Sequence, residues 1–488
     1  MGESFAQEQV REEARTHGLF AIAKMSPELI SRCRSLFRLE IIPAKLIHPS
    51  SPATDNFWSS VGEAFSFLKG LPPELRSGRL KTGVLARTNA ETVILEAVIR
   101  TVGIQGYRSL RNVVLPLAQL SVITGANGSG KSSVYRSLRL LADVAQNAVV
   151  GSLAREGGLP STFWAGPGTI ARSVRQGTHA VEPLAPQTAS LKLGFGSDVY
   201  GYSIDLGYPQ ALKPPLATMF TLDPRVKREC IWHGPAYRKA SALVDRRNNF
   251  VWLSTIRDEE PAFLTQHLSD TDSMIASIAD PQRAPEMLAV REAMRGWRFY
   301  DQFRTDTASP VRSSQIGTWT PVLHHDGSNL AAALQTIMEI RSDEALATTL
   351  DDAFPGSQLR IENKAGHFEV MLQQHGLLRS LSVAELSDGT LRYLLLIAAL
   401  LTPRPPELMV LNEPETSLHP DLLPALARLI LAAAAQTQIV VVSHAQPLIE
   451  TLTASPLCTH LHLQKDFGET TIKGTTLFNK PKWEWPSR

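Results

Sequence analysis

The stretch GANGSGKSS, from Gly125 to Ser133, constrains the fold of this chain more than any other feature. It matches the pattern G-x-x-x-x-G-K-[ST] and follows an apolar, β-branched run, LAQLSVITG, that is typical of a strand. The next segment, SSVYRSLRLLADVAQNAVV (Ser132 to Val150), has apolar residues at helical spacing: Val134, Leu138, Leu141 and Ala145. A glycine-rich turn could match the pattern by chance, but strand, loop and helix follow in the order that a phosphate-binding loop requires. The sequence therefore predicts an α/β fold built around such a loop.

The residue types of this loop suit a nucleotide phosphate. Glycines let backbone N–H groups curl around phosphate oxygens, and the N-terminus of the following helix adds partial positive charge. Lys131 is predicted to neutralise the β- and γ-phosphates, and Ser132 to offer a hydroxyl to Mg²⁺. The predicted nucleotide-binding residues of the loop are Gly125, Ala126, Asn127, Gly128, Ser129, Gly130, Lys131, Ser132 and Ser133. A nucleotide with Mg²⁺ is therefore the expected ligand.

A second polar element follows another apolar run, in LMVLNEPETSLHP (Leu408 to Pro420). A nucleotide hydrolase of the Walker type carries Asp-Glu-Pro at this strand end, whereas this chain carries Asn-Glu-Pro. Glu413 is predicted to orient and deprotonate the attacking water, a role worth ~10² to 10⁴ in rate. Asn412 is predicted to face Ser132 and a metal-coordinated water, but it lacks one negative charge, ~4 kcal/mol at ~4 Å with an effective dielectric of ~20. We expect weakened metal affinity and slow turnover; the alternative is that NEP only ends the strand.

Composition places the chain among ordinary globular proteins. Hydrophobic residues make up 43%, charged residues 20%, and the formal net charge is +2, so the overall charge does not indicate a nucleic-acid partner. The scattered cysteines, Cys33, Cys230 and Cys458, have no CxxC spacing and predict neither a disulfide framework nor a zinc site. The longest apolar run, LLLIAALL, is too short to span a membrane, and the N-terminal segment lacks the apolar stretch of a secretory signal. We therefore expect a cytoplasmic protein with no membrane partner.

Further motifs accompany these two elements. LSDGTLR (Leu386 to Arg392) precedes a long apolar helix, YRSLRNVVLPL precedes the glycine loop, and the second half of the chain also contains HDGSNLAAAL, ETSLHPDLLPAL and VVVSHAQPLIE. Together they resemble the ATP-binding-cassette (ABC) superfamily, in particular its branch of RecF-, SMC- and OLD-like AAA-family ATPases, over roughly residues 98 to 475. The resemblance implies an ABC-type P-loop NTPase head: a RecA-like mixed sheet with flanking helices, an inserted antiparallel β region and a helical lobe.

The resemblance also implies roles for residues outside the glycine loop. Ser387, Asp388 and Gly389 would form the signature motif that completes the ATP site of a second subunit, although the same residues suit a simple helix cap. Arg108 would approach the nucleotide, and His444 would sense the γ-phosphate, whereas a lone histidine after a strand is usually unremarkable. No glutamine takes the Q-loop position, which STFWAGPGT occupies. The chain also lacks the heptads of an SMC coiled coil, and its end after His444 is too short for a TOPRIM nuclease domain.

The expected organisation has five parts. Residues 1–95 form an extension with no assignable chemistry, and residues 476–488 form a C-terminal tail. Residues 96–190 and 326–475 hold the two parts of the ATPase core, separated by an inserted β and helical region at 191–325. ASLKLGFGSDVYGYSIDL predicts antiparallel hairpins, and APEMLAVREAMRGWRFYDQF and SNLAAALQTIMEI predict helices. Trp483 and Trp485 in the tail could pack on the domain or meet a partner.

These features predict an ATP-gated homodimer that hydrolyses ATP slowly and works in DNA maintenance or repair, or in defence against mobile elements, with a separate effector protein. The alternative is a nucleotide-gated scaffold that recruits a partner with negligible hydrolysis, which Asn412 and the missing glutamine favour. A transporter-type cassette subunit fits less well, because of the inserted β region and the Ser-Asp-Gly-Thr signature. DNA binding stays open, because acidic residues interrupt the basic cluster in the middle of the chain and a solvated face is the alternative. The basic residues are Arg225, Lys227, Arg228, Arg238, Lys239, Arg246 and Arg247.

Overall fold

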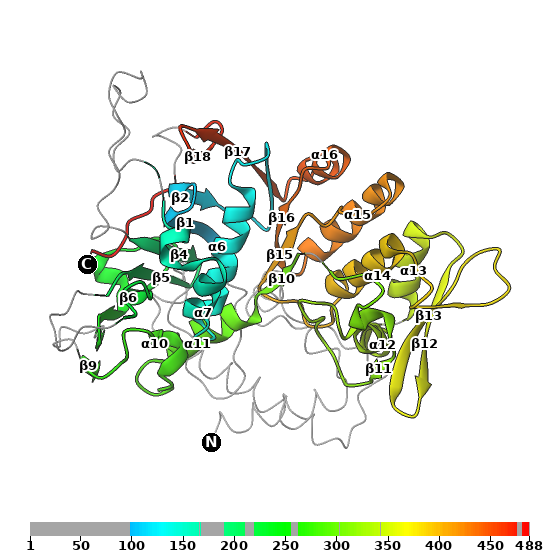
Figure 1. The fold of residues 1–488 in the computed structure, drawn as a ribbon, viewed down its shortest axis with the longest axis horizontal. Coiled ribbons are helices and arrows are strands. Elements are labelled where there is room, and N and C mark those ends of the chain that lie inside the picture. The colour runs from blue at the N-terminus through cyan, green and yellow to red at the C-terminus, as the bar shows by residue number, and fades with distance from the viewer. Residues whose placement is uncertain are drawn as a thin grey trace, which may run out of the picture. The chain divides into compact units, whose positions relative to one another are not determined.

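In the computed structural model, the glycine loop follows a central strand of a six-stranded sheet (Figure 1). In spatial order this sheet contains β10 (Arg298–Tyr300), β15 (Leu408–Asn412), β16 (Gln438–Val442), β3 (Leu120–Gly125), β17 (Cys458–Asp466) and β18 (Glu469–Ile472). The strands from β10 to β17 run parallel, and β18 returns antiparallel to β17. The predicted strands before Gly125 and Asn412 are thus confirmed as members of one sheet.

The structure describes residues 98–164, 166, 190–209, 219–254, 262–301, 303–341, 343–475 and 481–487, all of which lie in the unit Ile94–Arg488. The predicted N-terminal extension, residues 1–95, lies outside the described residues. Among the described residues, no helix combines the length and the apolar character that crossing a membrane requires.

The parallel strands are buried on both faces. In β15, Leu408 and Val410 belong to one hydrophobic core, whereas Met409 and Leu411 belong to the other. Side chains of a strand alternate between the two faces of its sheet, so a strand covered on both sides needs a continuous apolar run. That requirement explains why LMVL stands directly before Asn412.

One face of the parallel sheet packs against a second, antiparallel sheet and a group of helices. The antiparallel sheet contains β2 (Leu110–Pro116), β1 (Ile99–Tyr107), β4 (Leu191–Ser197), β5 (Tyr200–Gly207), β6 (Arg225–His233), β7 (Ala242–Arg247), β8 (Phe250–Leu253) and β9 (Ala262–Thr265). The predicted hairpin is present as β4 and β5. The sheet is not confined to residues 191–325, because β1 pairs with β4 and brings strands from before the glycine loop into it.

The helices on this face are α6 (Lys131–Val144), α7 (Val149–Arg155), α8 (Gly158–Thr162), α10 (Met274–Ser277) and α11 (Pro285–Gly296), with a short 3-10 turn, η3 (Lys239–Ser241), beyond β6. The apolar face predicted for the helix after the glycine loop is fully buried. The predicted helix to Val150 is too long, however, because α6 ends at Val144 and the chain turns at Asn147, whose φ is +56°. The buried side chains of α6 are distributed along its whole length, from Lys131 to Val144.

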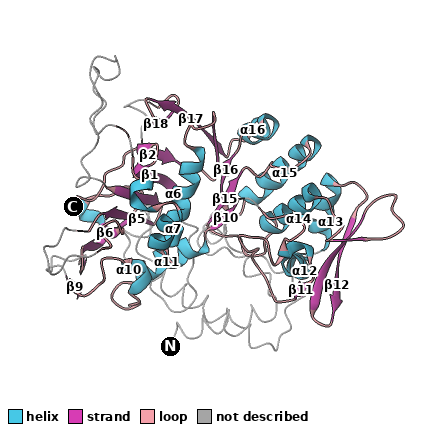
Figure 2. Cartoon of the chain, in the orientation of Figure 1, coloured by secondary structure: helices cyan, strands magenta, loops and turns pink. Residues whose placement is uncertain are grey.

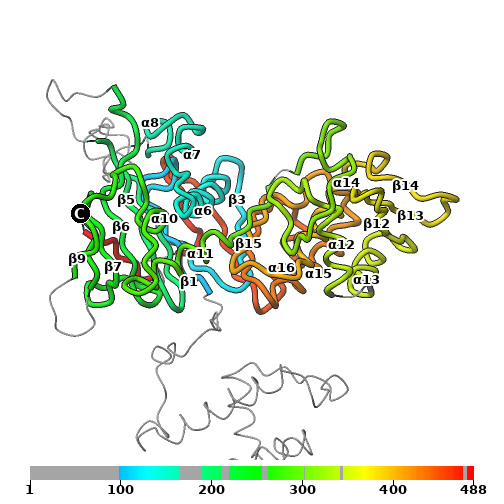
Figure 3. The backbone as a smooth tube through the Cα atoms, turned by 90° about the horizontal axis from the view of Figure 1, so that it is seen from below, coloured from blue at the N-terminus to red at the C-terminus, as the bar shows by residue number. Residues whose placement is uncertain are grey.

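The other face of the parallel sheet carries the helical lobe, whose position Figures 2 and 3 show from two directions. It contains α12 (Leu330–Arg341), α13 (Asp343–Ala353), α14 (Asp388–Leu400), α15 (Leu423–Ala434), α16 (Gln446–Thr453) and the 3-10 turns η4 (Pro310–Arg312) and η5 (Pro420–Leu422). A small sheet of β11 (Gln315–Ile316), β13 (His367–Gln373), β12 (Gln358–Lys364) and β14 (Leu381–Ser382) packs on α12 and α13. The apolar run LLLIAALL lies in α14, which is buried as expected.

The stretch APEMLAVREAMRGWRFYDQF is only partly helical, which corrects the prediction. Helix α11 ends at Gly296, and Arg298–Tyr300 form β10, which pairs with β15. Glycine is a poor helix residue, and the aromatic side chains of Phe299 and Tyr300 favour a strand. The consequence is that Asp301 stands at a strand end next to Asn412.

The described part of the C-terminal tail packs on the antiparallel sheet. The Trp483 ring lies over Gly103 and Gly194, where any Cβ atom would crowd it. Its ring centroid is 5.9 Å from that of Trp232 and 5.1 Å from that of Trp485, with both pairs edge to face. Of the two alternatives for these tryptophans, the structure shows packing on the domain.

Candidate functional site

The glycine loop is held in place by the strands beside it. At Gly130, the residue before α6, φ is +108° and a Cβ atom would collide with the side chain of Thr470. At Gly125, where φ is +151°, a Cβ atom would collide with the carbonyl oxygen of Leu463. The Thr470 hydroxyl in β18 lies 2.8 Å from the carbonyl oxygen of Ser129 and donates to it. Both glycines are thus required by backbone conformation and by space.

The polar groups of the loop suit an anion. Lys131 is buried, and its Nζ donates to the carbonyl oxygens of Gly125 at 2.7 Å and Ala126 at 3.2 Å. Ser132 is exposed in the first turn of α6, whereas the hydroxyl of Ser129 is buried without a hydrogen-bond partner. That first turn carries no acidic residue, so no carboxylate there offsets the partial positive charge of the helix N-terminus. A lysine, an unsatisfied hydroxyl and a helix N-terminus at one loop are the features of a phosphate site.

Parallel register brings four strand ends to the same edge of the sheet. Leu411 pairs with Tyr300, Asn412 pairs with Val442, and Val442 in turn pairs with Ile123. The residues that follow these strands therefore line one edge, where open α/β sheets place their ligands. Ile123, Tyr300 and Leu411 are more than a hundred residues apart from one another in the sequence, and the sheet brings them together.

Glu413 occupies the first position after β15 in an unusual conformation. Its φ is +48°, in the left-handed region that costs a non-glycine residue about 1–3 kcal/mol. The backbone N–H of Glu413 donates to the carbonyl oxygen of Val442 at 2.8 Å, which fixes this turn to the neighbouring strand. Its side chain is partly exposed, at 36%. The turn thus presents a carboxylate at the strand edge and keeps it accessible to water.

His444 is brought to Glu413 by a second carboxylate, that of Glu415. Glu415 Oε1 accepts hydrogen bonds from the Ser443 hydroxyl at 2.7 Å and from the backbone N–H groups of His444 at 2.9 Å and Ala445 at 3.2 Å. His444 Nδ1 lies 3.4 Å from Glu415 Oε1 and 3.9 Å from Glu413 Oε1. The structure therefore brings the predicted pair Glu413 and His444 together. Glu415 itself was not predicted, although ETS directly after NEP placed it at the same strand end.

A buried arginine lies beneath this edge. Arg392 in α14 is 4% exposed, and its Nη2 lies 3.3 Å from the carbonyl oxygen of Asp301 and 3.5 Å from that of Glu413. Burial lowers the pKa of the Arg392 guanidinium, and the nearby charges of Asp301, Glu415 and Glu413 oppose that shift. The guanidinium group of Arg392 therefore joins α14 to the residues that follow β10 and β15. Sequence reasoning missed Arg392 as well, because a basic residue in an apolar helix gave no sign of its partners.

The signature residues lie away from the glycine loop of the same chain. Ser387 caps α14, since its Oγ accepts from the Thr390 N–H at 3.1 Å, and Asp388 pairs with Arg312 Nη2 at 2.6 Å. Figures 1 and 3 place α14 and α6 on opposite sides of β15, in agreement with their membership of different cores. The capping interpretation is thus correct in geometry, and the phosphate role of Ser387, Asp388 and Gly389 would require a second chain.

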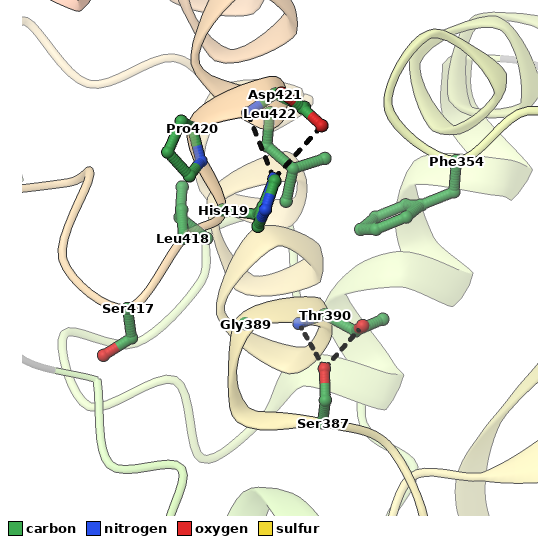
Figure 4. Close-up of a pocket in the computed structure, with 10 residues that line it drawn as sticks. All are labelled: Phe354, Ser387, Gly389, Thr390, Ser417, Leu418, His419, Pro420, Asp421 and Leu422. Atoms are coloured by element: carbon green, nitrogen blue, oxygen red, sulfur yellow. Dashed lines mark hydrogen bonds and ion pairs between the residues drawn. The ribbon is translucent and has the colours of Figure 1, made fainter.

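An open groove of about 620 Å³ lies between the signature residues and the segment after Glu413 (Figure 4). Ser387, Gly389 and Thr390 line one side, and residues 417–422 with Phe354 line the rest. A Cβ atom at Gly389 would lie 2.9 Å from the carbonyl oxygen of Ser417, so the two segments are closely apposed. Signature residues and strand-end loop thus share one surface of the helical lobe.

Arg108, which the resemblance places near the nucleotide, is paired with a carboxylate in this structure. Its Nη2 lies 2.7 Å from Glu156 Oε2, and the Tyr107 hydroxyl donates to the same oxygen at 2.6 Å. Arg108 has a φ of +49°, and the neighbouring Ser109 is linked to the loop through Thr470. Arg108 therefore lies close to the glycine loop, and its guanidinium group is paired with the carboxylate of Glu156.

The basic cluster in the middle of the chain is largely neutralised. Arg246 and Glu229 are fully buried and joined at 2.6 Å, and Arg228 is 4% exposed and paired with Asp245 at 2.9 Å. Buried, paired guanidinium groups cannot follow a phosphate backbone. These residues hold the antiparallel sheet together, so Arg228 and Arg246 fit neither the solvated face nor the nucleic-acid surface that the sequence left open.

The sequence comparisons agree with this geometry. A sequence model of one protein family, described as "AAA domain, putative AbiEii toxin, Type IV TA system", matches residues 120–450, more than half of the 488-residue chain. The chain belongs to this AAA domain family. The match spans the glycine loop, Asn412, Glu413 and His444. Comparison with the curated proteins found no match.

Among solved structures, similar chains include Smc head domains. One is an Smc head bound to the C-winged helix domain of ScpA, with 14% identity, a TM-score of 0.41, and coverage of 78% of this chain and 99% of that chain. Another is the SMC head domain from Thermotoga maritima, with 12% identity, a TM-score of 0.35, and coverage of 78% and 100%. These likenesses are distant. The family match, together with the glycine loop on a mixed sheet flanked by helices, identifies the fold as an AAA-domain α/β fold with a P-loop, an antiparallel β region and a helical lobe.

Proposed function

We propose that this AAA domain protein is a Mg²⁺-dependent ATPase that hydrolyses ATP slowly and works as an ATP-gated dimer. The position of Glu413 carries the proposal. Its carboxylate lies at the sheet edge that also holds the glycine loop, partly exposed, with His444 Nδ1 3.9 Å from Oε1. A carboxylate that is accessible and held at a strand end can orient water and accept its proton.

The residues present fit a magnesium–nucleotide complex. The buried, unpartnered hydroxyl of Ser129 and the ammonium group of Lys131, which bonds to loop carbonyls, are donors that phosphate oxygens would satisfy. Among the described residues, no group of three or more His, Cys, Asp or Glu side chains could hold a metal ion by itself. Mg²⁺ in such sites is usually held by one or two protein groups and by the substrate phosphates. We assign Ser132 and Asn412 to the metal, which when bound would neutralise charge on the phosphate oxygens.

The other residues then have distinct tasks. Lys131 and the backbone N–H groups from Gly128 to Ser133 bind the phosphates, and Glu413 accepts the proton of the attacking water. His444 lies beside Glu413 and would respond to the γ-phosphate. Arg108, paired with Glu156 through Nε and Nη2, would approach the nucleotide from beside the loop.

The arrangement of α6 and α14 supports a dimer. Each chain carries a phosphate loop on one side of β15 and a signature motif on the other. The loop and the motif of one chain would therefore not meet at the same ATP. Two copies related by a twofold axis would complete both sites, because each surface meets the complementary one of its partner. The groove beside Ser387 and Gly389 lies on the surface that such a partner would cover.

For the biological setting we propose defence against mobile elements, with a separate effector protein. The family description, which names a toxin and a Type IV TA system, supports this choice over general DNA maintenance. The buried arginines of the basic cluster argue against DNA binding through that part of the antiparallel sheet.

The test is ATP turnover by the full chain and by its Glu413→Gln variant, with and without DNA. We expect the variant to lose about 10²- to 10⁴-fold in rate and to form a dimer in ATP by mass measurement. Glu450→Gln, which alters an exposed carboxylate of α16, is the matched control and should retain the wild-type rate. Wild-type turnover no faster than that of Glu413→Gln would contradict the proposal.

A second candidate function is a nucleotide-gated scaffold with negligible hydrolysis. The amide at position 412 favours it, because one carboxylate is missing where metal charge is balanced. Tight ATP binding and ATP-dependent dimerisation, without phosphate release over hours, would support the scaffold over the motor.

A further inference from the structure

Asn412 and Asp301 form a pair across two neighbouring strands. Asp301 follows β10 and Asn412 ends β15, and Asn412 Nδ2 donates to Asp301 Oδ1 at 2.8 Å. An ionised carboxylate can only accept hydrogen bonds, so the amide must present its nitrogen to Asp301. The Asn412 oxygen is thereby turned away from Asp301 and can act as an acceptor elsewhere.

Asp301 also lies close to the helix that follows the glycine loop. Phe299 in β10 packs edge to face on Tyr135 in α6, with ring centroids 6.0 Å apart. Burial and the negative charge of Asp301 raise the pKa of Tyr135 to about 12. Tyr135 stands one helical turn after Ser132, so the strand that precedes Asp301 packs on α6 close to the predicted metal site.

The backbone of Asp301 is also held by a hydrogen bond. Its carbonyl oxygen accepts from Arg392 Nη2 at 3.3 Å, and the side chain is only partly exposed. A carboxylate with a fixed backbone and a fixed hydrogen-bond partner keeps its charge at a defined position. Such groups beside metal ligands typically tune metal affinity by about 10- to 100-fold.

We propose that Asp301 supplies the negative charge that Asn412 lacks, so that the Asp301–Asn412 pair balances the Mg²⁺ of bound nucleotide in place of a single aspartate. The inference rests on the proposed function, because it assigns a role within the same site. Asp301 is a positioning and charge-balancing residue: it orients the amide of Asn412 and adds its charge beside it. The carboxylate that position 412 lacks is thus provided by Asp301, which directly follows the neighbouring strand β10.

The experiment measures the affinity of a fluorescent ATP analogue, mant-ATP, in Mg²⁺ and in EDTA, using full chains that all carry Glu413→Gln to prevent hydrolysis. The ratio of the two dissociation constants gives the metal-dependent gain. We expect Asp301→Asn to reduce this gain by about 10- to 100-fold and to leave the affinity in EDTA unchanged. The swapped variant Asp301→Asn with Asn412→Asp should recover most of the gain, because it returns one carboxylate and one amide to the pair.

Asp306→Asn is the control. It removes a carboxylate of the same segment that is exposed and paired with Arg304, and it should not change the gain. Thermal unfolding of each variant shows whether the fold is kept. Should Asp301→Asn not fold, the swapped variant decides alone: a folded protein that has lost the metal-dependent gain overturns the proposal.

An undiminished gain in Asp301→Asn, or the absence of any gain in the parent protein, also overturns it. Failure of the proposed function would look different. In that case mant-ATP would not bind to the parent protein even in EDTA, or Lys131→Ala would not weaken its binding.

Discussion

Glu415 and Ser443 are joined by a buried hydrogen bond of 2.7 Å, from the Ser443 hydroxyl to Glu415 Oε1. The same oxygen accepts from the backbone N–H groups of His444 and Ala445, whereas Oε2 is buried without a partner. One carboxylate thus ties the loop after β15 to the loop after β16. The separation of Glu413 and His444 depends on this tie.

Glu415→Ala should lower both stability and turnover. It removes the Glu415 acceptor from the Ser443 hydroxyl and the His444 N–H, whereas the Ala445 N–H keeps Ser443 Oγ at 3.1 Å. Hydrogen bonds to charged groups contribute about 1.5–3 kcal/mol each to stability. A shift of about 1 Å in His444 could cost on the order of 10² in rate. Thermal unfolding and ATP turnover measure the two effects. A variant that keeps the wild-type rate would show that the position of His444 does not matter for hydrolysis.

Arg392→Met tests the link between the signature helix and the strand ends. Methionine fills similar space, but it removes the donor to the carbonyl oxygens of Asp301 and Glu413 and the cation among three carboxylates. We expect a loss of stability of about 1.5–3 kcal/mol, typical of hydrogen bonds from a charged group, and weaker dimer formation in ATP by mass measurement. Arg428→Met, which alters an exposed arginine paired with Asp352, is the control. If Arg392→Met and Arg428→Met changed stability and dimer formation equally, Arg392 would contribute no more than an exposed surface arginine does.

The sequence was sufficient to predict the parts of the site that are local. The glycine loop, Glu413 and His444 each follow an apolar strand directly, so strand pattern and motif place them at one sheet edge. Asp301 and Arg392 could not be predicted in this way, because their partners come from strands or helices far away in the sequence. The short strand before Asp301 was concealed within a helical pattern, and only its pairing with β15 reveals it.

The same distinction applies to charge. A run of basic residues such as Arg225–Arg228 tells the reader that positive charges are present. It does not tell which acidic side chains lie opposite them in the fold. Whether Arg246 binds phosphate or a buried Glu229 depends on the register of β6 and β7, which composition does not determine. For Arg246, the buried pairing with Glu229 excludes contact with a phosphate.

Trp483→Ala should destabilise the antiparallel sheet. The ring covers Gly103 and Gly194 and packs edge to face on Trp232, and aromatic pairs contribute about 0.5–1.5 kcal/mol beyond their buried area. We expect a loss of about 1–3 kcal/mol in unfolding free energy. Trp319→Ala removes a tryptophan that is 60% exposed and should cost much less.

A double-mutant cycle sharpens this prediction. Gly103→Ala introduces a methyl group that collides with the Trp483 ring, so it should destabilise the wild-type protein more than it destabilises Trp483→Ala. Additive effects in denaturant unfolding would show that the tail does not lie on Gly103 in solution.

Mixing two inactive variants tests whether the signature motif acts in the partner chain. Lys131→Ala disables the phosphate loop, and Ser387→Arg blocks the signature surface at the start of α14. If the site is shared between chains, a mixed dimer holds one intact site, formed by Lys131 of one chain and Ser387 of the other. Equal mixing makes roughly half of the dimers mixed, so the activity should recover to about a quarter of the wild-type value. If each chain used its own signature residues, every chain in the mixture would carry one defect and the activity would not recover. Because α6 and α14 lie on opposite sides of β15, we expect recovery.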